Sequence, residues 1–154
     1  TIDSPNKLMA WAQADGRKIG RIRLARVADA SAKSLRPAVV HAVEPGTQIQ
    51  TDAWTGYAGL TDVGYEHRVV RPTADLGENL LPRANRIAAL LKRWLLGTHQ
   101  GAVSPDHLDY YLDEYTFRFN RRTSRSRGLL FSRLMEQAVA LEPVRGQDLI
   151  GGVR

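Results

Sequence analysis

The spacing at which apolar residues recur changes part-way along the chain, and this change restricts the fold more than any other feature. Up to about residue 71, short apolar runs alternate with polar residues and turn signals, which is typical of strands with helices between them. From Arg83 onward, apolar residues recur every three or four positions, which is typical of amphipathic helices. We therefore expect an α/β fold, with a mixed sheet flanked by helices and a helical C-terminal part.

A β-hairpin followed by a helix is predicted for the first third of the chain. Residues 7–14 and 19–27 are apolar-rich and flank Asp15-Gly16, a strong turn signal. Ser31 has the side chain of an N-cap, and apolar residues at helical spacing follow it until Pro45-Gly46 ends the segment.

Two short strands are predicted next, at residues 47–51 and 65–71, with a helical turn at residues 57–60 between them. The first strand leads directly into Asp52, so we expect this carboxylate at the strand's end. Residues 72–82 are rich in Pro, Gly, Asp and Asn and have no periodicity, which predicts a loop close to a functional site.

Three helices are predicted in the second half. The first runs from Arg83 to a C-cap at Gly97, the second opens at Ser104-Pro105, and the third covers about residues 129–141. We expect one domain, residues 1–142, followed by a frayed, flexible tail, residues 143–154. The three tryptophans have apolar neighbours, which predicts core positions for Trp11, Trp54 and Trp94.

Composition narrows the class of ligand. The chain has 154 residues with 22 Lys+Arg against 16 Asp+Glu, a net charge of +6 that favours polyanions such as nucleic acid. It has no cysteine, which excludes a disulfide framework, a thiolate nucleophile and a Cys-ligated zinc or iron–sulfur site. No apolar run approaches the roughly 18 residues of a membrane span, and the GxSxG, P-loop and GxGxxG motifs are absent.

Three polar residues have the chemistry of a metal-dependent phosphoryl-transfer site. A carboxylate at a strand end, as expected for Asp52, suits hard cations such as Mg²⁺. Asn85 and Lys92 are seven residues apart, about two helical turns, so they share one helix face and offer an amide oxygen and a phosphate-binding charge. Considered alone, these residues have simpler interpretations: Asp52 as a turn residue or cap, Asn85 as a helix cap and Lys92 as a solvated side chain.

Basic residues gather between residues 117 and 127, a segment with five arginines in eleven positions and no acid. Arginine's planar fork matches phosphate oxygens, so nucleic-acid contact is favoured over a merely solvated face. The residues predicted to bind nucleic acid are Lys92, Arg93, Arg118, Arg121, Arg122, Arg125 and Arg127. The four histidines lack metal-ligand spacing and are predicted to be structural or phosphate-facing: His41, His67, His99 and His107.

Several blocks of the sequence resemble a known family. They are LLKRWLLGTHQGAV (90–103), HLDYYLDEY (107–115) and FRFNRR (117–122), with TDAW (51–54) and Gly56-Tyr57 upstream. Together they closely resemble the ISXO-type insertion-sequence transposases, bacterial DDE-type enzymes with a ribonuclease-H-like core. The resemblance extends from about Asn6 to Pro143.

The resemblance implies roles for individual residues. Asp52 matches the second metal-binding carboxylate, Asn85 falls at the third ligand, usually Glu in the family, and Lys92 matches a basic residue seven positions later. The implied cofactor is a pair of Mg²⁺ or Mn²⁺ ions, which activate water and then a DNA 3′-hydroxyl to cut element ends and join them to target. The implied partner is double-stranded DNA, with a homo-oligomer forming on it. The implied location is the bacterial cytoplasm, at the nucleoid and not at a membrane.

The sequence also departs from the family pattern. The first catalytic aspartate, expected in a V-D-E-T-Y-like block on the first strand, has no counterpart, because Asp3, Asp15 and Asp29 do not fit that position. The N-terminal zinc ribbon is missing as well, in keeping with the lack of cysteine, and Ala53 replaces a usual Gly. We therefore expect an N-terminally truncated copy without its first strand, impaired in catalysis by itself.

Two alternatives remain open at this point. One is a non-catalytic DNA- or RNA-binding remnant that keeps the basic helical face. The other is a remnant that acts by assembling with a full-length transposase.

Overall fold

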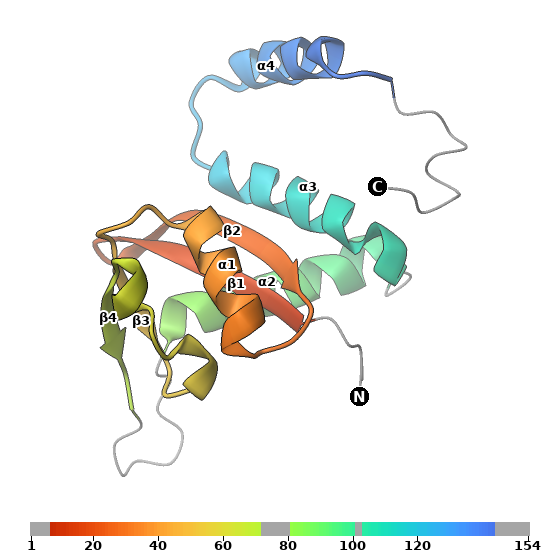
Figure 1. Cartoon of the computed structure of the whole chain (residues 1–154). Coiled ribbons are helices and arrows are strands. Elements are labelled where there is room, and N and C mark those ends of the chain that lie inside the picture. Colours follow the sequence, from red (N-terminus) through yellow and green to blue (C-terminus); the bar gives the residue numbers. More distant parts are fainter. Residues whose placement is uncertain (1–6, 72–80, 101–102, 144–154) are drawn as a thin grey trace.

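The fold is mixed α/β, as predicted (Figure 1). The computed structural model describes residues 7–71, 81–100 and 103–143. The predicted tail beyond residue 143 and most of the predicted loop at 72–82 lie outside these ranges.

The predicted hairpin is confirmed. Strands β1 (Lys7–Asp15) and β2 (Lys18–Val27) pair antiparallel, and Gly16 adopts a φ of 55° at the turn, a conformation that favours glycine. The register shifts between Ala12 and Ala14, where the bulged part of β2 brings Gly20 close to the Gln13 side chain.

Helix α1 (Ala32–Ala42) begins where the sequence predicts, after Ser31. The Ser31 hydroxyl oxygen accepts a hydrogen bond from the Ser34 N–H at 3.4 Å, which satisfies one of the unpaired donors of the first turn. Pro37 lies inside the helix on an exposed position, so its ring faces solvent rather than the core.

The second sheet is a separate parallel pair, β3 (Gln48–Thr51) with β4 (Glu66–Val69). Between these strands, 3₁₀ turns occur at Thr55–Tyr57 and Thr61–Val63. The single helical turn predicted at 57–60 is therefore wrong in position, because the chain winds before and after Ala58–Leu60 instead.

The three C-terminal helices are α2 (Pro82–His99), α3 (Leu108–Asn120) and α4 (Arg127–Ala140). The predicted C-cap at Gly97 is wrong: the helix continues to His99, and Gln100 ends it in the left-handed conformation with a φ of 50°. Ser104 caps a 3₁₀ turn, Pro105–His107, through a bond from the Asp106 N–H to its hydroxyl at 3.2 Å, and α3 follows directly.

The hairpin forms a layer between α1 and the pair α2/α3, because its side chains alternate between two faces (Figure 1). Met9 and Val27 pack with α1, Leu60 and Tyr65 in one core cluster. Ile22 packs on the opposite face, in a second cluster with Ile87, Leu91, Leu112 and Tyr115 from α2 and α3.

Helix α4 stands apart from the hairpin, α1 and α2 in Figure 1, and neither core cluster includes a described residue of this helix. Its apolar side chains are largely exposed, with Phe131 67% and Val139 81% accessible. Of the predicted core tryptophans, Trp11 and Trp94 are half-buried against the two clusters, as expected. The prediction for Trp54 is wrong, because its side chain is 54% exposed.

Candidate metal and nucleic-acid site

Asp52 directly follows β3, as the sequence predicts, and its surroundings hold it in place. Its Oδ1 atom accepts a hydrogen bond from the Trp54 N–H at 3.3 Å, and its backbone carbonyl accepts one from the Thr51 hydroxyl at 2.8 Å. The Nε2 of His67 lies 2.7 Å from the same Thr51 hydroxyl oxygen, so the two side chains are hydrogen-bonded. The hydrogen bonds from Trp54 and Thr51 hold the half-buried side chain of Asp52 through its carboxylate and its backbone through the carbonyl.

Tyr57 shares this environment. Burial raises the pKa of the Tyr57 phenol, and the negative charge of Asp52 raises it further. The phenol is therefore neutral at physiological pH.

Asn85 and Lys92 lie on α2, on a different element from Asp52. Both are exposed, while Ile87 and Leu91 on the same helix are buried, so the two polar residues lie on the solvent-facing side of α2. The end of β3 and the first turn of α2 appear at the same corner of the molecule in the view of Figure 1. A shared metal site for Asp52 and Asn85 stays a prediction.

Possible metal-ligating side chains do not form a cluster in the described part of the chain. Within residues 7–71, 81–100 and 103–143, no three His, Asp or Glu side chains gather closely enough to hold a metal ion. Asp15 ends β1 and Asp29 precedes α1, where its Oδ1 accepts from the Ser31 N–H at 2.8 Å. Hydrogen bonds from Ser31 lower the pKa of Asp29, so this aspartate serves the helix start.

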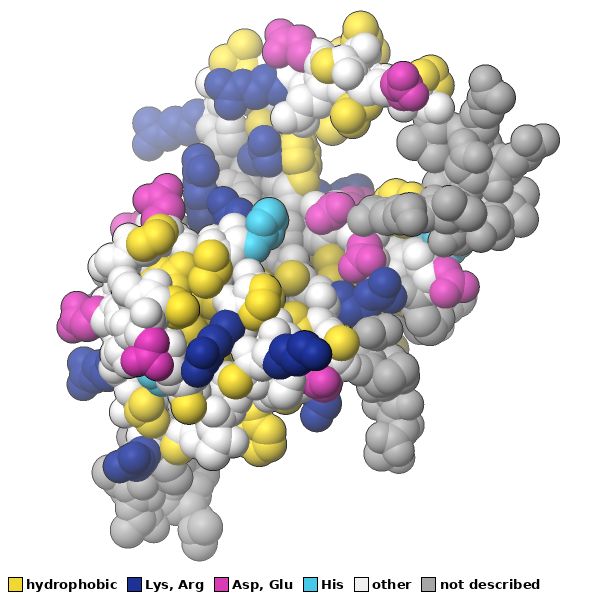
Figure 2. Space-filling model, in the orientation of Figure 1, with side chains coloured by type: hydrophobic (Ala, Val, Ile, Leu, Met, Phe, Trp, Pro, Cys, Tyr) yellow, Lys and Arg dark blue, Asp and Glu magenta, His cyan; other side chains and the backbone are white. Residues whose placement is uncertain are grey.

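The predicted arginine run divides into residues with different surroundings. Arg118 pairs with Glu114 one turn earlier at 2.7 Å, and the Arg121 guanidinium lies 3.8 Å from the centre of the Phe117 ring. Arg125 is exposed on the link to α4. Figure 2 shows lysine and arginine side chains gathered around the end of α3 and this link.

Asn120 is a residue that sequence reasoning missed. Its Oδ1 accepts from the Ile22 N–H at 2.7 Å, and its Nδ2 donates to the Ile22 carbonyl at 2.9 Å, so one side-chain amide satisfies both backbone groups of a β2 residue. The available signal was its position: Asn120 is one turn after Thr116 and two turns after buried Leu112, at the edge of the apolar stripe of α3.

Arg122 completes this attachment to β2. Its guanidinium donates to the carbonyl oxygens of Ile19 and Phe119 and stacks 3.9 Å from the centre of the Phe119 ring. We call Asn120 and Arg122 the β2 clasp. The FRFNRR block thus has a role in joining α3 to the hairpin, and phosphate contact by Arg122 stays a prediction.

Two of the four histidines make the structural contacts predicted for them. His67 bonds Thr51, and the His99 ring packs 4.9 Å from Trp94 and 4.5 Å from Tyr111 between ring centres. None of the helices in the described part of the chain is long and apolar enough to span a membrane.

Comparison with known protein families adds the decisive observation. A model of the ISXO2-like transposase domain matches residues 5–120, about three quarters of the 154-residue chain. The chain belongs to this family. The matched part of this transposase domain ends at Asn120, so α4 and most of the arginine run follow it. No curated protein and no solved structure matches the chain.

Proposed function

We propose that this transposase domain acts in DNA transposition through a DDE-type site that includes Asp52 and Asn85. The observation that carries the proposal is the family match over residues 5–120, together with a positioned carboxylate at the end of β3. When bound, a pair of Mg²⁺ or Mn²⁺ ions would supply the Lewis acidity for in-line attack on phosphodiesters, the chemistry of cutting and joining DNA ends.

The residues present fit such a site only in part. The carboxylate of Asp52 and the amide oxygen of Asn85 are hard ligands of the kind these cations prefer. One carboxylate does not balance two divalent ions, and the described part of the chain gathers no acidic cluster. The proposed site therefore requires a further carboxylate from outside the described residues, and we expect catalysis to be impaired without it.

The arrangement of the strands also points to a missing element. The antiparallel pair β1–β2 and the parallel pair β3–β4 are separate two-stranded sheets. We propose that they are two parts of one ribonuclease-H-like sheet. A further strand, placed in the sheet between β1 and β3, would join them. That strand would also be the natural position for the further carboxylate.

The proposed DNA surface consists of exposed basic side chains on α2 and beyond α3. Lys92, Arg93 and Arg125 are exposed, and Arg118 is 69% accessible despite its pairing with Glu114. These residues would hold the DNA backbone without reading its sequence. Because each neutralised phosphate contributes about 0.9 to the slope of log affinity against log salt, duplex binding should weaken steeply as salt rises.

The experiment is a nicking assay on supercoiled plasmid in Mg²⁺ or Mn²⁺, run alongside duplex binding at several salt concentrations. We expect salt-sensitive binding with little cleavage, and weaker binding when Lys92 and Arg93 become Ala. Robust cleavage that Asp52→Ala abolishes would overturn the claim of an incomplete site. A duplex affinity that does not change with salt concentration would contradict the proposed phosphate contacts.

A second candidate function is a non-catalytic DNA-binding remnant. It is favoured by the lack of a metal-ligand cluster among the described residues and by the basic side chains around the end of α3 (Figure 2). Calorimetry separates the two functions. Specific Mg²⁺ or Mn²⁺ uptake that is lost in Asp52→Ala supports a surviving metal site, whereas DNA binding without such uptake supports the remnant.

A further inference from the structure

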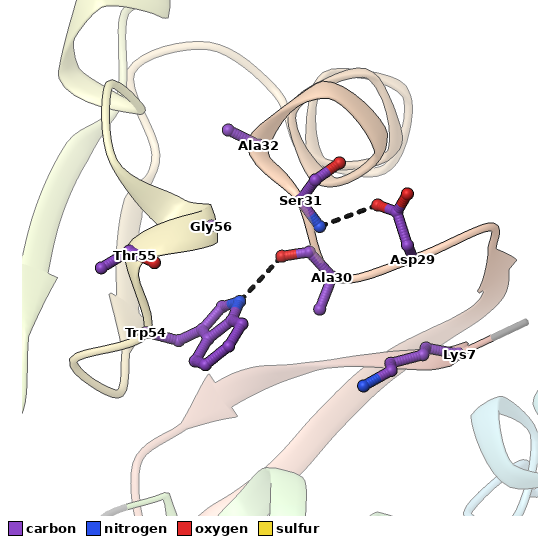
Figure 3. Close-up of a pocket in the computed structure, with 8 residues that line it drawn as sticks. All are labelled: Lys7, Asp29, Ala30, Ser31, Ala32, Trp54, Thr55 and Gly56. Carbon is purple, nitrogen blue, oxygen red and sulfur yellow. Dashed lines mark hydrogen bonds between the residues drawn. The ribbon is translucent and has the colours of Figure 1, made fainter. Parts of the chain in front are cut away.

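Trp54 is an aromatic residue that the fold exposes but does not leave free to move. Its side chain is 54% accessible, while its indole Nε1 donates a hydrogen bond to the Ala30 carbonyl at 2.7 Å (Figure 3). A ring held in this way loses little conformational entropy when a planar ligand packs on its open face.

Gly56 permits this arrangement. A Cβ atom at residue 56 would lie 2.7 Å from the Trp54 Nε1 and 2.7 Å from the Leu35 Cδ1, and it would also meet the Ala30 carbonyl oxygen. Glycine is therefore needed for the indole to reach Ala30, so the local sequence Trp54-Thr55-Gly56 specifies an exposed ring in a defined place.

The indole borders a pocket of about 400 Å³ between the start of β1, the start of α1 and the segment after β3. Lys7 lies across this pocket, and Figure 3 shows its ammonium end pointing toward the indole. Asp29 is the acidic residue of the lining, and hydrogen bonds from Ser31 and Ser34 at the start of α1 already engage its carboxylate. The pocket thus offers an aromatic face and a cation to a ligand.

This combination fits a nucleotide. Aromatic side chains bind unpaired bases by stacking, and a neighbouring lysine neutralises the adjoining phosphate. A paired base in a duplex presents only its edge, so the stacking face of Trp54 selects single-stranded or flipped nucleotides.

We propose that the pocket receives an unpaired nucleobase stacked on Trp54, with Lys7 contacting the adjoining phosphate. The proposal rests on the DNA-handling function above and adds a substrate feature to it. The Trp54 N–H bonds the Asp52 carboxylate, so the nucleotide would be held beside the segment that carries the candidate metal ligand. Trp54 would then be a positioning residue for a frayed or single-stranded DNA end.

The test measures the affinity of the full chain for a fluorescein-labelled 12-nucleotide single strand and for the matched 12-base-pair duplex. We expect Trp54→Ala to weaken single-strand binding roughly 5- to 150-fold, the equivalent of about 1–3 kcal/mol per stacked base, and to change duplex binding less than about twofold. Trp54→Phe keeps a stacking ring and should restore most of the affinity. Lys7→Gln should reduce the slope of log affinity against log salt by about 1, the contribution of one phosphate contact.

Leu96→Ala, which removes an exposed apolar side chain on α2, is the matched control and should leave both affinities unchanged. Thermal unfolding of each variant checks that the fold survives. Equal losses on single strand and duplex, or unchanged single-strand binding in Trp54→Ala, would overturn the proposal while leaving the DNA-binding function in place. Failure of the unmodified chain to bind either DNA would overturn both.

Discussion

The β2 clasp makes a quantitative prediction about the FRFNRR block. Asn120 makes hydrogen bonds of 2.7 and 2.9 Å to the two backbone groups of Ile22, a residue only 1% exposed. Asn120→Ala removes both bonds and leaves the Ile22 N–H and carbonyl without these partners. A hydrogen bond contributes about 0.5–1.5 kcal/mol, and an unsatisfied buried group costs about 1–3 kcal/mol.

From these values we expect Asn120→Ala to lower the free energy of unfolding by about 2–4 kcal/mol. That is a large fraction of the total for a small domain, which is typically about 5–15 kcal/mol. For a chain of this length, the melting temperature should fall by roughly 5–15 °C. Urea denaturation followed by circular dichroism measures the change directly.

Arg125→Ala is the control, because Arg125 is exposed and belongs to the same basic run. Its effect on stability should stay within about 0.5 kcal/mol, whereas its effect should appear in DNA binding. If Asn120→Ala unfolds at the same urea concentration as the unmodified chain, the clasp does not stabilise the fold. If that variant is stable yet fails to bind DNA, the block acts on DNA and the structural role assigned to Asn120 is refuted.

Three further predictions concern other parts of the fold. Gly56→Ala should lower the free energy of unfolding by about 1–3 kcal/mol in urea denaturation, because a Cβ at this position has no space. Gly97→Ala, with nothing within 4 Å of its Cβ, should stabilise helix α2 by about 0.5–1 kcal/mol. Equal effects of the two substitutions would contradict the packing around Trp54. Leu112→Ala should cost about 2–5 kcal/mol, because this side chain is 2% exposed at the centre of the second core, and a loss under 1 kcal/mol would refute that placement. Asp52→Asn should lower the pKa of Tyr57 in an ultraviolet tyrosinate titration, because it removes the negative charge that adds to the effect of burial. An unchanged titration curve would show that the Asp52 charge does not act on Tyr57.

The direction of the Tyr57 pKa shift also determines how Tyr57 affects stability as pH changes. Its pKa in the folded chain is raised above the ordinary value, so its contribution is fully present below the unfolded pKa and is lost as pH rises through the folded pKa. Asp52→Asn should therefore make stability less sensitive to alkaline pH. The comparison of the two pH profiles checks this expectation.

Local patterns predicted most of the elements because the physics that forms them is local. Asp15-Gly16 predicts the hairpin turn, Ser31 predicts the start of α1, and the apolar spacing after Arg83 predicts the helices. The end of α2, misplaced at Gly97, shows where tertiary packing overrides such a local signal. A glycine inside an exposed helix costs about 1 kcal/mol, which the packing of Ile87 and Leu91 outweighs.

The roles of side chains depended on contacts that the sequence does not display. Trp54 reads as a core residue from its neighbours, yet Ala30, 24 positions earlier, holds it at the surface. Asn120 and Arg122 read as part of a basic surface, yet they bond β2 residues 98 and 103 positions earlier. The sequence by itself determined the family, the basic character and the order of the elements, since these follow from residue identity and short-range periodicity. Only the tertiary structure decided which polar and aromatic residues stabilise the fold and which face a ligand, because that choice is made by backbone groups distant in sequence.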